Sequence, residues 1–453
     1  MEILIAGAGK VGKALTKELG SEGHNITLID SKAVVLEDAQ TKYDVITYEG
    51  NAASQVALKE SGVENMDVFI AATNADEVNM LACLTAHTLN PRIRTIARIR
   101  NPLYIDQAYQ MSGAFGVDLV INPERTSASE IATQLKYPGF LKRETFAKAR
   151  VQIVELKATR ENKLADVMLK NIHNVLKSKI LITAVLRDNQ AYMPNGDFIL
   201  RENDTVFVTG EPEQLHNMLK NIGVITKPVK HCVICGGGRI SYYLAQQLEK
   251  SHITSTIIEI DPKKCDELAC TLPNTTIING DVSSQAVLDG EDIGEYDALV
   301  SCTGLDELNI VTSLYATANG IPNVVTKLGR GEDRKLINSL NIGSTVCPKD
   351  LITMHIVRYV RAIQNKEGAA LTIHKIADGH AEVIEFSVDK DTKHIGEALK
   401  DLKIRRNVLI ASIGSGTSTV IPNGNSSFKL GDTVIVVTNA SSTIYQLNDI
   451  FEA

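Results

Sequence analysis

No apolar run in this sequence approaches the roughly 18 residues that a helix needs to cross a bilayer. The sequence also has no tract of lysine and arginine long enough to form a membrane-surface patch. Its net charge is −7, and a mildly acidic chain is a poor candidate for nucleic-acid binding, which requires clustered cations. Residues 1–7 have the pattern of a strand that runs into a glycine motif, not of a signal peptide. We therefore expect a cytoplasmic protein that binds no nucleic acid and whose role at a membrane is peripheral.

The seven cysteines match neither a disulfide framework nor a metal site. Cys83, Cys302 and Cys347 lie in apolar runs, which is typical of reduced, buried thiols. Cys232 and Cys235 have the C-x-x-C spacing, but they lie on a predicted strand, where residues three apart point to opposite faces. No second Cys or Cys/His pair stands near them to complete a tetrahedral site, so we predict no metal ligands.

The most informative feature that is present is an internal repeat. The segment Gly7-Ala-Gly9-Lys-Val-Gly12 returns 229 residues later as Gly236-Gly-Gly238-Arg-Ile-Ser241, and Thr27-Leu-Ile-Asp30 returns at the same spacing as Thr256-Ile-Ile-Glu259. The segment from Thr73 to Asn79 returns 230 residues later, from Thr303 to Asn309. A unit of about 230 residues is too long for a solenoid repeat. The sequence therefore indicates a tandem duplication of a two-domain module.

Each module is predicted to contain two kinds of domain. Its first part alternates apolar strands with helical patterns, which predicts an α/β fold with a doubly wound parallel sheet of Rossmann type. In the first module these are strands at 2–6, 26–30, 45–48, 68–72 and 95–99 and helices at 10–19 and 76–89. The second part predicts a small α+β domain, with strands at 151–157, 182–186 and 205–209 and a helix at 164–171. We predict domains at 1–140, 141–226, 227–366 and 367–453, with a linker between modules at 223–231.

The glycine motif of the first module follows a predicted strand and opens a predicted helix. Gly7 permits the tight turn, Gly9 lets the backbone approach a pyrophosphate, and Gly12 allows the helix to pack closely on the strand. The helix N-terminus then offers free N–H groups to the phosphates. Asp30 ends the second strand, where a carboxylate accepts both ribose hydroxyls and repels a 2′-phosphate. This favours NAD or a plain adenine nucleotide over NADP.

Further candidate binding residues follow the other strands, because ligands of open α/β sheets lie at the carboxyl ends of the strands. Asp76 and Glu77 are instead interpreted as acidic residues that favour a helix start. The predicted cofactor-binding residues of the first module are Gly7, Ala8, Gly9, Lys10, Val11, Gly12, Asp30, Asn51, Thr73, Asn74 and Arg98. Those of the second module are Gly236, Gly237, Gly238, Arg239, Ile240, Glu259, Asp281, Thr303 and Lys327.

The second module departs from the pattern at two positions, with Ser241 for the third glycine and Glu259 for the aspartate. Binding there is expected with a different affinity. The alternative for either module is a nucleotide-free Rossmann domain that keeps its glycines for packing alone.

These motifs together resemble the TrkA family of potassium uptake regulators, in which two RCK (KTN) nucleotide-binding domains are each followed by a small C-terminal domain. The resemblance covers essentially the whole chain and rests on residues 5–12, 72–80, 97–101 and 137–139. It implies binding of NAD(H) and of ATP or ADP. It also implies assembly into a ring-like homo-oligomer, which we expect to be a tetramer, and docking on a membrane potassium-translocating subunit of the TrkH/TrkG type.

The resemblance favours a regulator over an enzyme, and we predict no catalytic residues. An NAD-dependent oxidoreductase, the alternative, needs a general acid or base beside the nicotinamide. His173 and His216 are isolated on polar or helical segments. A scaffold that has lost ligand binding is a third possibility.

The segment Leu351–Ile363 is more apolar than a one-faced surface helix should be, which predicts a homo-oligomer formed through the Rossmann halves. Burial of this segment within its own chain is the alternative.

Overall fold

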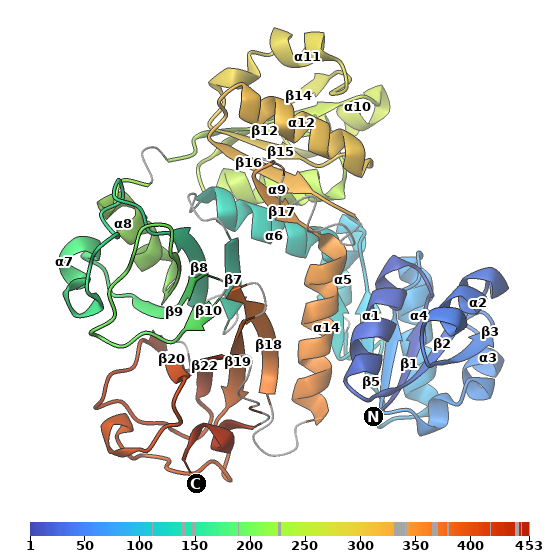
Figure 1. The fold of residues 1–453 in the computed structure, drawn as a ribbon. Coiled ribbons are helices and arrows are strands. Elements are labelled where there is room, and N and C mark those ends of the chain that lie inside the picture. Colours follow the sequence, from blue (N-terminus) through green and yellow to red (C-terminus); the bar gives the residue numbers. More distant parts are fainter. Residues whose placement is uncertain are drawn as a thin grey trace. The chain divides into compact units, whose positions relative to one another are not determined.

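The computed structural model describes residues 1–110, 112–136, 142–146, 151–188, 190–224, 228–329, 340, 342–364, 370–377, 380–416, 418–439, 444 and 446–452. The chain forms two compact units, and each is assembled from both halves of the sequence (Figure 1). One unit contains residues 1–136 and 229–360, and the other contains residues 137–228 and 361–453.

The first unit begins with a parallel sheet of the predicted Rossmann type. Its strand order is β3-β2-β1-β4-β5-β6, so the order reverses between β1 and β4. The strands are β1 (Glu2–Ala6), β2 (Asn25–Asp30), β3 (Ile46–Glu49), β4 (Val68–Ala71), β5 (Arg94–Arg98) and β6 (Leu119–Ile121). The helices are α1 (Lys10–Ser21), α2 (Ala33–Lys42), α3 (Gln55–Glu60), α4 (Asp76–Leu89), α5 (Pro102–Gln110) and α6 (Pro123–Lys136). The predicted strands and helices of this domain are confirmed, with ends that differ by one or two residues.

A second parallel sheet repeats this topology, with the order β14-β13-β12-β15-β16-β17. Its strands are β12 (His231–Cys235), β13 (Thr254–Glu259), β14 (Thr275–Asn279), β15 (Ala298–Ser301), β16 (Asn323–Lys327) and β17 (Ser344–Val346). Its helices are α9 (Arg239–Lys250), α10 (Pro262–Thr271), α11 (Gln285–Gly290), α12 (Asp306–Ala318) and α14 (Pro348–Gln364). Cys232 and Cys235 lie in separate buried clusters, which confirms that they face opposite sides of β12.

Helix α6 joins the two Rossmann halves of this unit. It belongs to the first module by sequence, yet Ala128, Ile131 and Leu135 are buried in the core of the second sheet, against helix α9. The apolar side chains of α6 are thus buried against the second module, and their burial holds the two modules together.

Helix α14 changes the argument for self-association. Ile352, Ile356 and Val360 are fully buried within the chain. Met354 on the same helix is 36% exposed, so α14 is buried within its own chain along part of its surface, and the prediction that Leu351–Ile363 mediates a homo-oligomer stays a prediction.

The second unit contains two antiparallel sheets, as expected for small α+β domains. The first has the order β10-β9-β11-β8-β7 and the second β18-β19-β22-β20-β21. The strands of the first are β7 (Lys142–Phe146), β8 (Val151–Lys157), β9 (Leu181–Arg187), β10 (Gln190–Tyr192) and β11 (Thr205–Gly210), with helices α7 (His173–Leu176) and α8 (Pro212–Asn221). Those of the second are β18 (Ala370–Ile376), β19 (Ala381–Ser387), β20 (Val408–Ser415), β21 (Ser418–Val420) and β22 (Thr433–Asn439).

The helix predicted at 164–171 is wrong, because the backbone of this segment bonds across to another strand-like segment. Asp166 N–H donates to Leu200 O at 2.8 Å, and Leu169 N–H donates to Phe198 O at 2.9 Å. Asp166 also has a φ of 63°, which a right-handed helix excludes. Only a short 3₁₀ turn forms, at Leu169–Asn171.

Two sequence predictions fall partly on undescribed residues. The predicted linker at 223–231 ends in β12, which begins at His231, and residues 225–227 lie outside the described part of the chain. The motif at 137–139 also lies outside it.

Candidate nucleotide-binding sites

The first glycine loop connects β1 to α1 at the point where the strand order reverses. Gly7 has a φ of 103°, and a Cβ there would lie 2.9 Å from Ala72 O. A Cβ on Gly12 would lie 1.8 Å from Gly7 O, so the helix start packs directly on the loop. A Cβ on Gly9 would meet no atom within 4 Å, so the space above this backbone is open. The geometry matches the predicted roles in turning, in packing and in leaving room for a phosphate.

Asp30 lies beside this loop and holds it. Its Oδ2 accepts a hydrogen bond from Ala8 N–H at 2.7 Å, and its Oδ1 accepts one from Lys32 N–H at 3.0 Å. A carboxylate has about four acceptor positions, so both oxygens can still accept hydrogen bonds from a ribose. Asp30 is therefore brought to the place that the sequence predicts.

Thr73 and Asn74 follow β4, and Thr73 is held by a residue that the prediction left out. Asn79 is fully buried, and its Oδ1 accepts from Thr73 N–H at 2.9 Å and from Thr73 Oγ1 at 2.6 Å. Its Nδ2 donates to Arg98 O at 2.8 Å, which ties the carboxyl ends of β4 and β5 together. The second module repeats the arrangement with Asn309 and Thr303. The sequence repeat could have indicated this role, because Asn79 and Asn309 occupy the same position in the two copies of the segment.

Asp76 does more than favour a helix start. Its Oδ2 accepts from Arg100 N–H at 2.9 Å and from Asn101 N–H at 2.7 Å, so it clamps the segment after β5 onto the start of α4. The guanidinium of Arg100 donates to Asn74 O. The interpretation of Asp76 as a helix-start residue is thus incomplete, because the partners of its carboxylate are distant in sequence.

Arg98 adds positive charge to this edge of the sheet. The pKa of Arg98 is lowered, mainly by burial and by the neighbouring Arg100 and less by Arg239. The carboxylates of Glu124 and Asp76 partly oppose this shift. Among the described residues, the Nε of Arg98 has no hydrogen-bond partner. A half-buried cation with a free donor is suited to an anionic group of a ligand.

The second glycine loop has the same backbone turn with different side-chain contacts. Gly236 has a φ of 103°, and Ser241 Oγ donates to Gly236 O at 2.5 Å. Glu259 accepts from Gly237 N–H at 2.6 Å and from Asp261 N–H at 3.0 Å, and the residue is only 7% exposed. The carboxylate of the second site is therefore less accessible than that of Asp30.

The cation of the second site is also engaged. Lys327 ends β16 as Arg98 ends β5, and its Nζ donates to Thr303 O at 2.6 Å. This bond uses one of the three N–H donors of the ammonium and holds the group at Thr303.

The remaining predicted residues divide by exposure. Lys10 and Arg239 are exposed at the first positions of α1 and α9. Val11 and Ile240 are buried, so only their backbones can contact a ligand. Asn51 Oδ1 accepts from Ala53 N–H, and Asp281 Oδ1 accepts from Ser283 N–H, so both are turn residues after a strand. The hydrogen bonds from Ser283 lower the pKa of Asp281.

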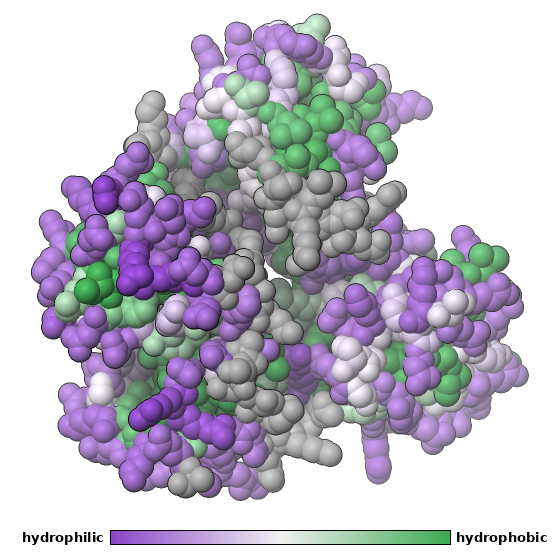
Figure 2. Space-filling model, viewed as in Figure 1, coloured by the Kyte–Doolittle hydropathy of each residue, from purple (hydrophilic) through white to green (hydrophobic). Residues whose placement is uncertain are grey.

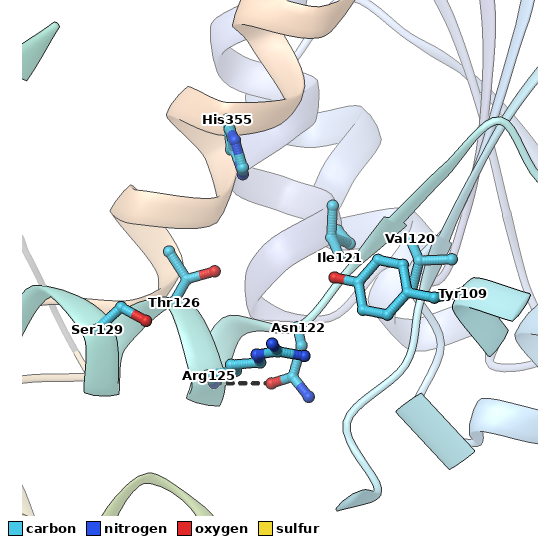
Figure 3. A pocket seen from close by; sticks show the side chains of 8 residues that line it. All are labelled: Tyr109, Val120, Ile121, Asn122, Arg125, Thr126, Ser129 and His355. Carbon is cyan, nitrogen blue, oxygen red and sulfur yellow. Dashed lines mark hydrogen bonds between the residues drawn. The ribbon is translucent and has the colours of Figure 1, made fainter. Parts of the chain in front are cut away.

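A pocket of about 210 Å³ lies apart from the glycine loops, at the start of α6 (Figure 3). Asn122, Arg125, Tyr109 and His355 contribute to its lining, and the guanidinium of Arg125 stands 5.8 Å from the centre of the Tyr109 ring. The Asn122 side chain accepts a hydrogen bond from Arg125 N–H at 2.8 Å. No sequence motif indicated this pocket.

Among the described residues, no histidine, cysteine, aspartate and glutamate side chains form a group that could hold a metal ion. In the same part of the chain, no helix has both the length and the apolar character needed to span a bilayer.

Two Rossmann sheets with paired glycine loops, each followed by a small antiparallel domain, define a tandem nucleotide-binding-type protein. The model of the TrkA-N domain matches residues 3–123 and 232–348, and that of the TrkA-C domain matches residues 153–223 and 383–451. The chain belongs to the TrkA family, which confirms the resemblance predicted from the glycine motifs.

Relatives of known name match along almost the whole chain. The Trk system potassium uptake protein TrkA homolog 1 of Methanosarcina mazei is 30% identical over 451 residues, which is 98% of either chain. The Trk system potassium uptake protein TrkA of Vibrio alginolyticus is 30% identical over 442 residues, 96% of this chain and 95% of that one.

Solved structures agree in fold. The RCK domain of GsuK has a TM-score of 0.61 at 16% identity and covers 97% of this chain and 92% of its own. The GsuK channel bound to NAD has a TM-score of 0.59 at 16% identity and covers 97% of this chain and 77% of its own. At this identity the likeness shows that the two proteins share a fold.

Proposed function

We propose that this chain is the nucleotide-sensing regulatory subunit of a potassium uptake system. It binds NAD(H), ATP or ADP and thereby changes flux through a membrane potassium-translocating subunit of the TrkH/TrkG type. The observation that carries the proposal is the carboxylate of Asp30 beside an open glycine loop at the reversal of strand order. The named relatives are Trk potassium uptake proteins, which supports the transport role.

The first module suits an adenine nucleotide without a 2′-phosphate. Asp30 would receive the ribose hydroxyls, and the backbone around Gly9 would approach the phosphates. Arg98 supplies a cation at the same edge of the sheet. Among proteins of this fold, one GsuK structure contains NAD and another contains ADP, which supports both ligand classes for this site.

We expect the second module to bind the same class of ligand more weakly. Glu259 is buried and the Lys327 ammonium is held by Thr303 O, so a ligand has less access to either group than to Asp30 and Arg98. This difference follows from the side chains, since the backbone turn at Gly236 matches that at Gly7.

The alternative function is an NAD-dependent oxidoreductase. Hydride transfer needs a proton donor or acceptor within hydrogen-bond reach of the reacting group. The polar side chains placed at the first glycine loop are Lys10, carboxylates, amides, a threonine and arginines, and Asp76 Oδ2 and Asn79 are occupied by structural hydrogen bonds. We therefore assign the site to binding without turnover.

A second surface besides α14 is a candidate for self-association. Leu81 on α4 and its counterpart Val311 on α12 are 49% and 62% exposed, and Leu314 is 37% exposed. Figure 2 shows apolar side chains gathered over α12. Because both modules expose large apolar residues at the same position, we propose that α4 and α12 mediate a homo-oligomer, of which a tetramer is the expected form.

The location follows from the proposed partner. The chain is expected to be cytoplasmic and to lie at the inner face of the cell membrane, held there by contact with the potassium-translocating subunit.

Calorimetric titration of the purified chain with NADH, NAD, ADP and ATP tests nucleotide binding, and absorbance at the NADH band over the same period tests turnover. The proposal expects saturable binding without loss of NADH. Absence of binding by all four nucleotides would contradict nucleotide sensing, and steady NADH oxidation would support the oxidoreductase.

A further inference from the structure

One hydrogen-bonded contact connects the helix of the second glycine loop to the first module. Helix α9 begins at Arg239, directly after the loop, and Tyr243 lies one turn further along it. The Tyr243 hydroxyl accepts from Asn122 Nδ2 at 3.1 Å and donates to Arg100 O at 3.4 Å. Tyr243 is 6% exposed and Asn122 is 3% exposed, so water does not compete freely for these groups.

Arg100 leads from this contact to the first candidate site. Its backbone N–H is bonded to the Asp76 carboxylate, and its guanidinium is bonded to Asn74 O. Asn122 Nδ2 also reaches Arg100 O, at 3.4 Å. The Tyr243 hydroxyl is therefore separated by one residue, Arg100, from Asn74, which is a predicted cofactor-binding residue of the first module, and from Asp76 at the start of α4.

The first module has no equivalent of this contact. At the position of Tyr243, helix α1 has Ala14, and at the position of Asn122, directly before the proline that starts α14, the chain has Cys347. A glycine-loop helix of this fold thus forms with a methyl group at this place. The hydroxyl of Tyr243 is not required by the Rossmann fold, and its two bonds are made only to the first module.

We propose that Tyr243 is a positioning residue for the first nucleotide site, supplied by the second module. By fixing Arg100 it restrains the Asn74–Asp76 segment in the position that receives the ligand, so the affinity of the first site depends on the placement of α9. This inference rests on the proposed nucleotide binding at Asp30. A ligand that moves the second glycine loop would change the first site through the same contact.

The test is calorimetric NADH titration of four full-length chains: the unaltered protein, Tyr243→Phe, Tyr242→Phe and Asp30→Ala. The binding that Asp30→Ala removes defines the first site. Tyr243→Phe should raise the Kd of that site about three- to tenfold. Tyr242→Phe is the matched control, because the Tyr242 hydroxyl bonds only within its own helix in the described structure, to Gln246 at 3.0 Å.

A packing role alone would lower the melting temperature of the Tyr243→Phe chain and leave the Kd of the first site unchanged, and that result overturns the inference. If Tyr243→Phe fails to fold, Asn122→Asp is the second variant. It keeps an acceptor for Arg125 N–H and removes the amide donor to Tyr243, so it should also weaken the first site. An unchanged Kd in a folded Asn122→Asp chain likewise overturns the inference. If Asp30→Ala removes no binding, the proposed site itself is wrong, whichever result Tyr243→Phe gives.

Discussion

Gly237 has no side chain at the place where Glu259 needs room. Gly237 N–H donates to Glu259 Oε2 at 2.6 Å, and a Cβ on Gly237 would lie 2.7 Å from Leu268 Cδ1 and 3.0 Å from both Cβ and Cγ of Glu259. In the first module the corresponding pair is Ala8 and Asp30, with the same bond at 2.7 Å. The longer carboxylate therefore occurs with the smaller loop residue, and the bond between loop and carboxylate is kept in both modules.

This pairing predicts a conditional effect of Gly237→Ala. The added methyl group should displace Leu268 and Glu259 and lower the free energy of unfolding by about 1–3 kcal/mol, the usual cost of overpacking. Gly237→Ala combined with Glu259→Asp shortens the carboxylate and should recover part of that loss, while the contact with Leu268 remains. Urea denaturation of the single and double variants measures both effects.

Ala8→Gly serves as the control for the pairing, because it removes a methyl group without creating a clash. It should change the free energy of unfolding by less than about 1 kcal/mol. Equal losses in Gly237→Ala and in the double variant would show that the length of the Glu259 side chain does not contribute to the cost of the methyl group.

The second prediction concerns Asp30. Asp30→Ala should weaken NADH binding at the first site by about 1.5–3 kcal/mol, because charged hydrogen bonds to the ribose are lost. Calorimetry measures the change. Glu259→Ala should have a smaller effect on total NADH binding, since the carboxylate of Glu259 is buried against its own loop. The assignment of the first site fails if Asp30→Ala binds NADH like the unaltered chain.

The third prediction concerns thiol reactivity. Cys270 is exposed, whereas Cys232, Cys235 and Cys302 are buried, and burial raises the pKa of these three thiols. A thiolate is the reactive form, so an aromatic disulfide reagent at neutral pH should label Cys270 rapidly and the buried cysteines only after unfolding. Cys270→Ser should abolish the rapid phase. A rapid phase that survives this change would show that another thiol is accessible.

The fourth prediction concerns the proposed surface for self-association. Leu81→Asp together with Val311→Asp should lower the molar mass measured by light scattering at micromolar concentration, because two exposed apolar residues become charged. Val34→Asp is the matched control, since Val34 is 76% exposed on α2, outside the proposed surface. An unaltered chain that is strictly monomeric would contradict the homo-oligomer altogether.

Much of the fold was predictable because the signals are local and repeated. Apolar strand patterns and the glycine motif located β1, α1 and β2, and the duplication predicted the second sheet. The helix expected at 164–171 failed because a short apolar pattern does not reveal that Asp166 and Leu169 bond to residues about thirty positions away. Propensity describes a segment alone, whereas these bonds depend on the tertiary fold.

The sequence predicted where the residues of the candidate sites lie in the fold, but it did not predict what their side chains contact. The motif placed Asp30 at the first loop, but it could not show that Glu259 is buried or that Lys327 bonds to Thr303. The burial of α6 in the second module and the Tyr243–Asn122 bond join residues more than a hundred positions apart. The apolar periodicity of α6 and of α9 predicts a helix in each case, but it does not indicate which distant residues the helix contacts.

The most direct test of the account is potassium flux in liposomes that contain a candidate TrkH/TrkG-type subunit with and without this chain. We predict that flux depends on the chain and changes about 5- to 150-fold with at least one of ATP, ADP, NAD and NADH, the usual range of allosteric coupling. The Asp30→Ala chain should lose much of that response. Flux that is insensitive to the chain and to all four nucleotides would contradict the account.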